Sequence, residues 1–196
     1  MGQYMSAIHC HNCKHQSLTF DTFMDLSLPI PKKSSSYSSY SYGGSSVSLA
    51  DCLGEFSKEE EIDKDYKCER CKKRGNCVKR TMLYKLPKIL VIHLLRFEYS
   101  SYSKKKISTS VSFPVTGLDL SEYIATSQSA SYNLFGISHH SGYMGGGHYV
   151  ADIKNSDGKW YHCDDSHASA SYSDPAGSGS SPYLLFYVRT DVSAKL

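Results

Sequence analysis

Two pairs of cysteines have the spacing of metal ligands. Cys10 and Cys13 form one C-x-x-C pair, and Cys68 and Cys71 form a second pair further along the chain. Each pair can place two thiolates on one side of a tight turn, and four thiolates make the closed tetrahedral shell that structural zinc prefers. The sequence therefore predicts one zinc ion bound by these four cysteines, with the residues between the pairs inserted as a helix and a loop.

Other side chains near the pairs are alternative ligands. Cys77, His9, His11 and His15 are close in sequence, and a surface or packing role is the alternative for each. Four thiolates leave no open position for water, so the zinc is expected to be structural. The region Met1–Cys10 lacks the features of a signal peptide, and no apolar run approaches the roughly 20 residues that cross a bilayer. We therefore expect an intracellular protein of the cytoplasm or nucleus, without membrane contact, whose seven cysteines are reduced.

One histidine has the setting of a catalytic base. His148 follows three glycines in the segment GGGHYV, and two acids, Asp164 and Asp165, follow in the segment CDDS. Glycines allow the close approach of an extended chain. An acid that binds the second ring nitrogen of a histidine fixes its tautomer and stabilises its charged form. The pattern predicts a base and its orienting carboxylate, but no cysteine or serine stands in a nucleophile setting.

The link between the histidine and the acids, NSDGK, predicts a β-hairpin. With Asp157 and Gly158 as its two central residues, His148 and Asp165 share one face of the sheet. One bulged residue would place Asp164 on that face instead. Spacing alone therefore names the pair of acids and leaves the choice between them open.

The composition is that of a folded, sheet-rich protein. The chain has 196 residues, 40% of them hydrophobic, and 16 tyrosines against a single tryptophan. This length predicts one domain with an appendage, and the tyrosines favour strands. The segments Ser34–Ser46 and Ser166–Ser181 are rich in small polar residues and are predicted to be loops.

The rest of the sequence predicts one helix and several strands. The helix starts at Ser48, with Asp51 completing a capping box and Cys52 in its apolar face. The almost continuously apolar run Lys88–Phe97 predicts a central strand covered on both faces. Further strands, bounded by turn residues, are predicted over Tyr132–His140, His148–Ile153, Lys159–Asp165 and Pro182–Arg189.

Several motifs follow one another along the chain: the cysteine pairs, KILVIHLLRF, YNLFGISHHSG, GGGHYVAD, the acids after KWYHC and the closing PYLLFYV. In this order they resemble the ubiquitin-specific protease family of cysteine deubiquitinases. The resemblance runs from about Tyr4 to Arg189. It implies an α+β, mainly antiparallel β, papain-like fold. Residues 1–83 would be zinc-ribbon fingers with a Ser/Tyr-rich loop at 34–46, and residues 84–196 would be a palm carrying the catalytic histidine and aspartate.

The resemblance also implies roles for single residues. His148 would be the general base, Asp164 the third catalytic residue and Asp165 an assisting neighbour. Two segments, Tyr99–Lys106 and His139–Gly147, would be loops that gate the channel for the ubiquitin tail. The zinc ligands would be Cys10, Cys13, Cys68 and Cys71, and the residues that contact the tail would be His140, Tyr149, Gly146 and Gly147.

Two features depart from the family pattern. The box that carries the nucleophilic cysteine at a helix start is expected to lie outside this chain, together with the thumb, because none of Cys52, Cys77 and Cys163 has that setting. The region His167–Ser181 also lacks the apolar positions that usually follow the acids. Ubiquitin or polyubiquitin, ubiquitinated proteins and a separate thumb segment are the expected partners.

Two other functions stay open. The same scaffold could be a non-catalytic ubiquitin-binding module, since the nucleophile is missing. A zinc-ribbon nucleic-acid binder using Lys72–Arg80 is disfavoured by the net charge of only +3 and by the lack of interleaved aromatic residues.

Overall fold

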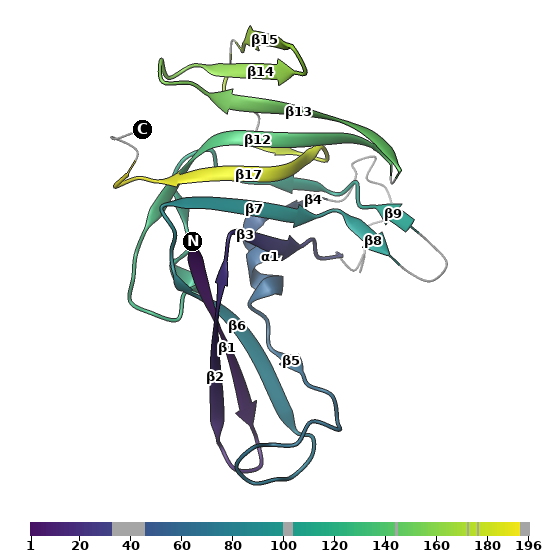
Figure 1. The fold of residues 1–196 in the computed structure, drawn as a ribbon, viewed down its shortest axis with the longest axis vertical. Helices are drawn as coiled ribbons and strands as arrows, with labels where there is room; N and C mark the ends of the chain where they lie inside the picture. Colours follow the sequence, from purple (N-terminus) through teal and green to yellow (C-terminus); the bar gives the residue numbers. More distant parts are fainter. Residues whose placement is uncertain (33–45, 100–103, 144, 172, 176, 193–196) are drawn as a thin grey trace.

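The structure is a computed structural model, and it describes all residues except 33–45, 100–103, 144, 172, 176 and 193–196. The Ser/Tyr-rich segment predicted at 34–46 lies outside the described residues, apart from Ser46. The remaining chain forms a broad curved sheet with a long, narrow ribbon projecting from it (Figure 1). No described helix is long and apolar enough to cross a membrane.

The ribbon is a four-stranded antiparallel sheet in the order β2-β1-β6-β5. Its burial pattern is mostly intermediate along β1 and mostly exposed along β2, so the ribbon has little apolar core of its own. The strands are β1 (Gly2–Cys10), β2 (Gln16–Phe23), β5 (Glu60–Glu61) and β6 (Cys77–Lys85).

The broad sheet has eight strands, in the order β15-β14-β13-β12-β17-β7-β3, with β11 pairing to β12. Its pairs are antiparallel except for β3 with β7, which agrees with the predicted mainly antiparallel fold. Its strands are β3 (Asp25–Pro29), β7 (Ile89–Leu95), β11 (Leu118–Asp119), β12 (Ser131–Tyr143), β13 (Gly146–Lys154), β14 (Trp160–Asp164), β15 (His167–Ala170) and β17 (Pro182–Arg189).

Short elements complete the described fold. A small sheet joins β16, β10 and β4, β8 pairs with β9, and a 3-10 helix lies at Ser121–Tyr123. The short strands are β4 (Ser46–Ser48), β8 (Phe97–Tyr99), β9 (Lys104–Lys106), β10 (Ser110–Ser112) and β16 (Ser178–Gly179). Strands β15 and β16 lie within the segment 166–181, so the prediction of a single loop there was wrong.

The helix α1 (Leu49–Phe56) has the predicted cap. The Oγ of Ser48 accepts from the backbone N–H of Asp51 at 3.0 Å, and the carboxylate of Asp51 accepts from the backbone N–H of Ser48 at 2.7 Å. Two donors at the start of the helix are satisfied in this way. Cys52 is fully buried in the apolar face, as predicted.

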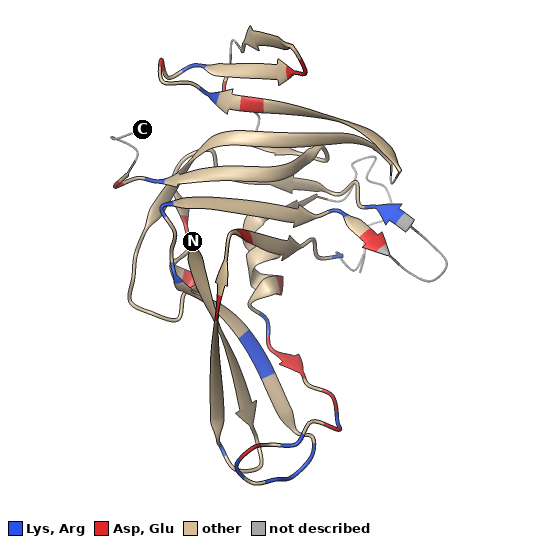
Figure 2. Ribbon diagram, viewed as in Figure 1, with Lys and Arg blue, Asp and Glu red and all other residues tan. Residues whose placement is uncertain are grey.

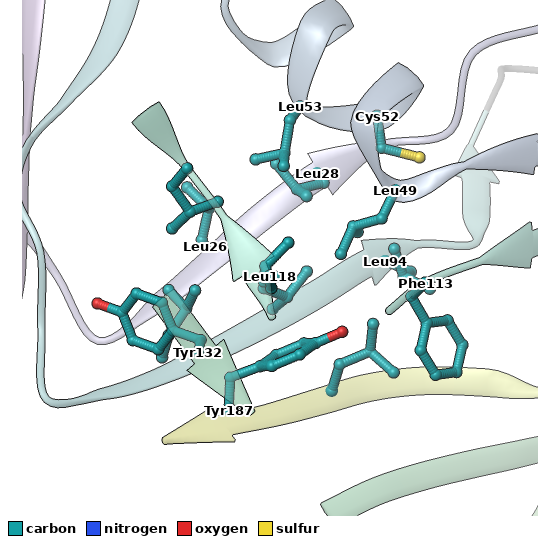
Figure 3. Packing of buried hydrophobic residues seen from close by; sticks show 14 of the residues in the cluster. Leu26, Leu28, Leu49, Cys52, Leu53, Leu94, Phe113, Leu118, Tyr132 and Tyr187 are labelled. Atoms are coloured by element: carbon teal, nitrogen blue, oxygen red, sulfur yellow. The ribbon is translucent and has the colours of Figure 1, made fainter. Parts of the chain in front are cut away.

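The main core lies between α1 and one face of the broad sheet (Figure 3). Leu90, Ile92 and Leu94 of β7 are fully buried there, whereas Ile89 and Leu95 are 38% and 40% exposed. Successive strand residues point to opposite faces, so one face of β7 is fully covered and the other only in part, within the part of the chain that the structure describes. The prediction of a strand covered on both faces was wrong. Strand β3 and helix α1 belong to this core, although they fall within residues 1–83.

Candidate catalytic and metal sites

The two cysteine pairs lie at the tip of the ribbon in two similar turns. Cys10 ends β1, and its carbonyl accepts from the N–H of Lys14 at 2.8 Å. Cys68 lies between β5 and β6, and its carbonyl accepts from the N–H of Lys72 at 3.0 Å. Both lysines are left-handed, with φ of 59° and 60°. The same local turn is therefore built twice, once at each pair.

The four sulfur atoms converge. The Sγ of Cys10 is 3.8 Å from that of Cys71, the Sγ of Cys13 is 3.8 Å from that of Cys68, and all four lie within 4.8 Å of one another. Four Zn–S bonds of about 2.3 Å in a tetrahedron require sulfur atoms about 3.8 Å apart. The thiolate set therefore fits a closed metal site and could hold one ion.

The alternative ligands stay outside this group of sulfur atoms. Cys77 is buried beside it, with its Sγ 3.5 Å from the carbonyl oxygen of Gly75. The rings of His9 and His11 contact each other edge to face at 5.1 Å. Their positions are those of packing or surface side chains.

The ribbon tip carries charges of both signs (Figure 2). Arg74 pairs with Asp65 at 3.2 Å, and Lys79 pairs with Glu60 at 3.5 Å. Within the described residues, the basic segment 72–80 is thus partly neutralised and does not form a uniformly positive surface.

The hairpin that joins β13 to β14 has a three-residue loop. The N–H of Asn155 donates to the carbonyl of Lys159 at 2.9 Å, and Ser156, Asp157 and Gly158 lie between them. Gly158 has a φ of 80°, as the left-handed position of such loops requires. The predicted two-residue loop was therefore wrong, and every facing pair is shifted by one residue.

This register brings Asp164 to the face of His148. Ala151 pairs with Cys163, so Asp164 shares the face of His148, and not Asp165 as the two-residue loop required. The Nε2 of His148 lies 2.5 Å from Oδ1 of Asp164. Asp165, the next residue, is left-handed with a φ of 49°.

The electrostatics of the pair favour a protonated ring. The hydrogen bond to Asp164 raises the pKa of His148, and the negative charges of Asp164 and Asp165 act in the same direction. An ionised carboxylate can only accept, so Nε2 carries a proton and Nδ1 remains for another group. Both side chains are about half exposed, at 49% and 50%, so a substrate or partner group can reach them.

The four residues predicted to contact the ubiquitin tail lie at the adjoining end of β12 and β13. His140 is buried and pairs directly with Tyr149, with ring centroids 4.7 Å apart. A Cβ on Gly147 would overlap Nε2 of His140 and lie 2.6 Å from the carbonyl oxygen of Ser141, whereas one on Gly146 would make only ordinary contacts. Glycine at position 147 is therefore required by the packing of the His140 ring.

Sequence reasoning missed two further rings beside His140. Phe97 lies 5.4 Å from its centroid and Tyr183 lies 6.2 Å from it. Phe97 ends the run KILVIHLLRF and Tyr183 is the second residue of β17, and no spacing rule connects them. The burial of His140 among these rings lowers its pKa, and the charge of Lys106 acts in the same direction.

The described residues of the two predicted gating loops lie largely in strands. In the first, Tyr99–Lys106, β8 and β9 form a hairpin around the undescribed residues 100–103. In the second, His139–Gly147, β12 continues to Tyr143 and β13 starts at Gly146. The Nζ of Lys106 donates to the carbonyl of His140 at 2.6 Å, so the two hairpins are joined.

A buried arginine holds the segments behind these hairpins. The guanidinium of Arg96 is fully buried and donates, among the described residues, to carbonyl oxygens at distances from 2.6 to 3.1 Å. Burial lowers its pKa to about 10. These acceptors belong to Ile107, Thr109, Gly179 and Pro182.

The three cysteines outside the metal set lie in different places. Cys52 is in the core, where burial raises its pKa to about 11, and Cys77 is buried in the ribbon. Cys163 precedes Asp164 on β14, so strand alternation turns it away from the face of His148. None of them has the setting of a nucleophile for His148.

Comparison with known proteins decides the family. A sequence model described as ubiquitin carboxyl-terminal hydrolase matches residues 1–187. The chain belongs to the ubiquitin carboxyl-terminal hydrolase family. Among its relatives, ubiquitin carboxyl-terminal hydrolase 2 of Gallus gallus is 42% identical over 100% of this chain, and the Homo sapiens protein of that name is 40% identical over 95%. The chain spans only 53% and 30% of the lengths of these two relatives.

Solved structures of the family share the fold. A yeast SAGA DUB module superposes with a TM-score of 0.81 at 34% identity, covering 96% of this chain and 40% of that chain. The SAGA Ubp8/Sgf11/Sus1/Sgf73 DUB module bound to ubiquitin aldehyde gives 0.79 at 31% identity, covering 96% and 41%. The predicted ubiquitin-specific protease family and fold are therefore confirmed.

Proposed function

We propose that this chain is the part of a cysteine deubiquitinase that supplies the general base and its orienting carboxylate, His148 and Asp164. The reaction is hydrolysis of the peptide or isopeptide bond after the carboxyl-terminal glycine of ubiquitin. The observation that carries the proposal is the 2.5 Å contact between Nε2 of His148 and Oδ1 of Asp164. This contact is open to solvent, and the chain belongs to the ubiquitin carboxyl-terminal hydrolase family. Another stretch of polypeptide supplies the nucleophilic cysteine.

The roles follow from the ring atoms. Asp164 holds Nε2–H of His148 and stabilises the charged ring, so Nδ1 takes the proton of the incoming thiol. The thiolate then attacks the carbonyl carbon of the terminal glycine. The proton on Nδ1 passes to the leaving amine as the carbon–nitrogen bond breaks. Water, activated by the same nitrogen, hydrolyses the thioester and releases the thiol. Asp165 assists by its charge beside the pair.

We also assign structural zinc to Cys10, Cys13, Cys68 and Cys71. The sulfur positions fit tetrahedral zinc, and a set of four thiolates leaves no position for a catalytic water. The ion would join the β1–β2 turn to the loop before β6. Since the ribbon has little apolar core, metal binding would supply much of the stability of its tip.

The remaining proposed roles concern the substrate. His140, Tyr149, Gly146 and Gly147 are assigned to the channel for the ubiquitin tail, where flat rings and glycine backbone leave room for a narrow extended chain. Ubiquitin, polyubiquitin and ubiquitinated proteins are the proposed partners. A segment that carries the thumb and the nucleophile, in this or a separate chain, completes the enzyme.

The test combines this chain with a separately made nucleophile-bearing segment of the family. Release of a fluorophore from the carboxyl terminus of ubiquitin is measured. The wild-type mixture should be active, and His148→Ala should lower the rate by about 10³-fold, while His167→Ala, an exposed histidine on β15, should not. Ubiquitin binding without hydrolysis would instead identify a non-catalytic ubiquitin-binding module.

A further inference from the structure

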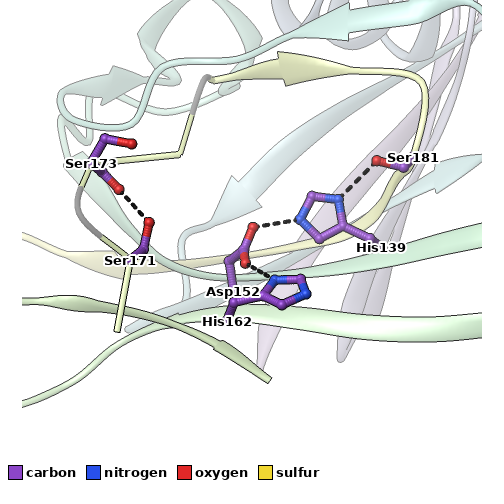
Figure 4. A network of polar contacts seen from close by, with 6 residues as sticks. All are labelled: His139, Asp152, His162, Ser171, Ser173 and Ser181. Carbon is purple, nitrogen blue, oxygen red and sulfur yellow. Dashed lines mark hydrogen bonds and ion pairs between the residues drawn. The ribbon is translucent and has the colours of Figure 1, made fainter. Parts of the chain in front are cut away.

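A chain of hydrogen bonds near the proposed site has no role in the mechanism above. The Oδ2 of Asp152 is 2.9 Å from Nε2 of His139, and its Oδ1 is 2.7 Å from Nδ1 of His162. The Nδ1 of His139 lies 3.0 Å from Oγ of Ser181. Figure 4 shows these four side chains in a row across neighbouring strands. One carboxylate thus braces β12, β13 and β14 together.

Neutral rings satisfy every one of these contacts. A carboxylate only accepts, so Nε2 of His139 and Nδ1 of His162 carry protons. The Nδ1 of His139 then accepts from the hydroxyl of Ser181. The side chains of His139 and Asp152 are only 16% and 24% exposed, so water competes with this bond less than with the exposed ion pairs of the surface.

The chain of hydrogen bonds ends two residues from the proposed carboxylate. Asp152 and His162 are directly paired on β13 and β14. His148 and Asp164 lie further along the same two strands and on the same face. The β13–β14 ladder stops at Cys163, so backbone pairing with β13 does not extend to Asp164.

Packing gives β14 little support on its outer side. Its neighbour there is β15, and all four residues of β15, His167–Ala170, are exposed. The residue that follows Asp164, Asp165, is left-handed. Among the described residues, the contact of His162, whose side chain is 47% exposed, with Asp152 is therefore the last side-chain hydrogen bond between β14 and β13 before the proposed site.

We propose that Asp152 and His162 are positioning residues that hold Asp164 within hydrogen-bond reach of His148. The inference deepens the proposed function, on which its significance rests, because the pair it positions is the proposed base and its carboxylate. His139 and Ser181 fix the carboxylate of Asp152 in turn.

The test compares two substitutions at His162 in this chain. Asparagine places an amide N–H near the position of Nδ1, so His162→Asn should keep the bond to Asp152, whereas His162→Leu removes it. The readout is the NMR titration of the His148 ring, assigned by its absence from the spectrum of His148→Ala. The midpoint should move to lower pH in His162→Leu, because the bond to Asp164 raises the pKa of His148, and stay unchanged in His162→Asn.

The comparison separates positioning from stability. The carboxylates beside His148, Asp164 and Asp165, remain in both variants, so a shift of the midpoint reports a change of position. A lower thermal midpoint in His162→Leu with an unchanged His148 titration would overturn the proposal, as would equal shifts in both variants. If His162→Leu does not fold, Asp152→Ser and Asp152→Asn, which lose the same charge, repeat the comparison. The titration of His148 needs no nucleophile. Its result can therefore be distinguished from a failure of the proposed function, which would appear as a failure to hydrolyse ubiquitin.

Discussion

The tip of the ribbon and the edge of the broad sheet bring together the side chains of the two proposed sites in different ways. At the tip, each cysteine pair closes its own turn, and Lys14 and Lys72 take the same left-handed conformation. At the sheet edge, His148 and Asp164 come from two strands and meet because the loop between them has three residues. A site made of local turns can be read from spacing, whereas a site made across strands depends on register.

The largest expected effect is the loss of a thiolate at the tip. Cys68→Ser removes one of four proposed zinc ligands and should cost several kcal/mol, because metal binding and folding are coupled where a core is small. Thermal unfolding and elemental analysis measure it, and wild-type protein should hold about one zinc per chain.

Cys163→Ser is the control for this substitution, since Cys163 lies outside the sulfur group. It should leave both the metal content and the unfolding midpoint near those of the wild type. Metal-free wild-type protein with an unchanged thermal transition would refute the zinc assignment.

The second prediction breaks the register of the sheet edge. Lys154 is the last residue of β13 and pairs with Trp160. Deletion of Lys154 keeps the three-residue loop but shifts β13 by one residue against β14, which moves the residues of β14 to opposite faces. Trp160 is buried in the wild-type fold and is the single tryptophan of the chain. The deletion should expose it to solvent, so its fluorescence should shift to the red. Activity in the mixture should fall with the loss of the His148–Asp164 contact.

The matched control is Lys154→Ala, which keeps the length of β13. It should preserve both the emission maximum and the activity. Unchanged emission after the deletion would mean that the loop absorbs the missing residue and that the core fixes the register.

A smaller effect is expected from filling the glycine contact beside His140. Gly147→Ala should destabilise the fold by about 1–3 kcal/mol, because the new methyl group meets the His140 ring and the carbonyl of Ser141. Gly146→Ala, where the methyl group meets only ordinary contacts, should cost less. Equal unfolding midpoints for the two variants would show that the strands separate easily here.

The smallest effect concerns pH. The pKa of His148 is raised in the folded chain, so its stabilising contribution is present at low pH and is lost as the pH rises through that raised value. NMR titration should show a lower midpoint in Asp164→Asn and a smaller shift in Asp165→Asn. The reverse order would favour the register with Asp165 beside His148.

Features set by neighbouring residues could be predicted from the sequence. The capping box of Ser48 and Asp51 is a three-residue relation, and the cysteine pairs are relations within one turn. The order of the motifs also gave the correct family, because it samples nearly the whole chain.

Features set by distant residues could not be predicted. Ile89 and Leu95 are as apolar as their buried neighbours, so the residue types alone do not indicate which face of β7 is covered. The contact of Asp152 with His139 and His162 joins three strands at positions that carry no spacing signal. The covered face of β7 and the contacts of Asp152 both depend on which strands lie next to each other in the folded chain.

The ladder between β13 and β14 ends before Asp164, on the side of the sheet where β15 is fully exposed. Such an edge opens at a lower free energy than the strands within the core. Backbone amides of β14 and β15 should therefore exchange their hydrogens with solvent sooner than those of β7 and β17. Fraying at this edge would switch off the proposed base while the rest of the domain stays folded.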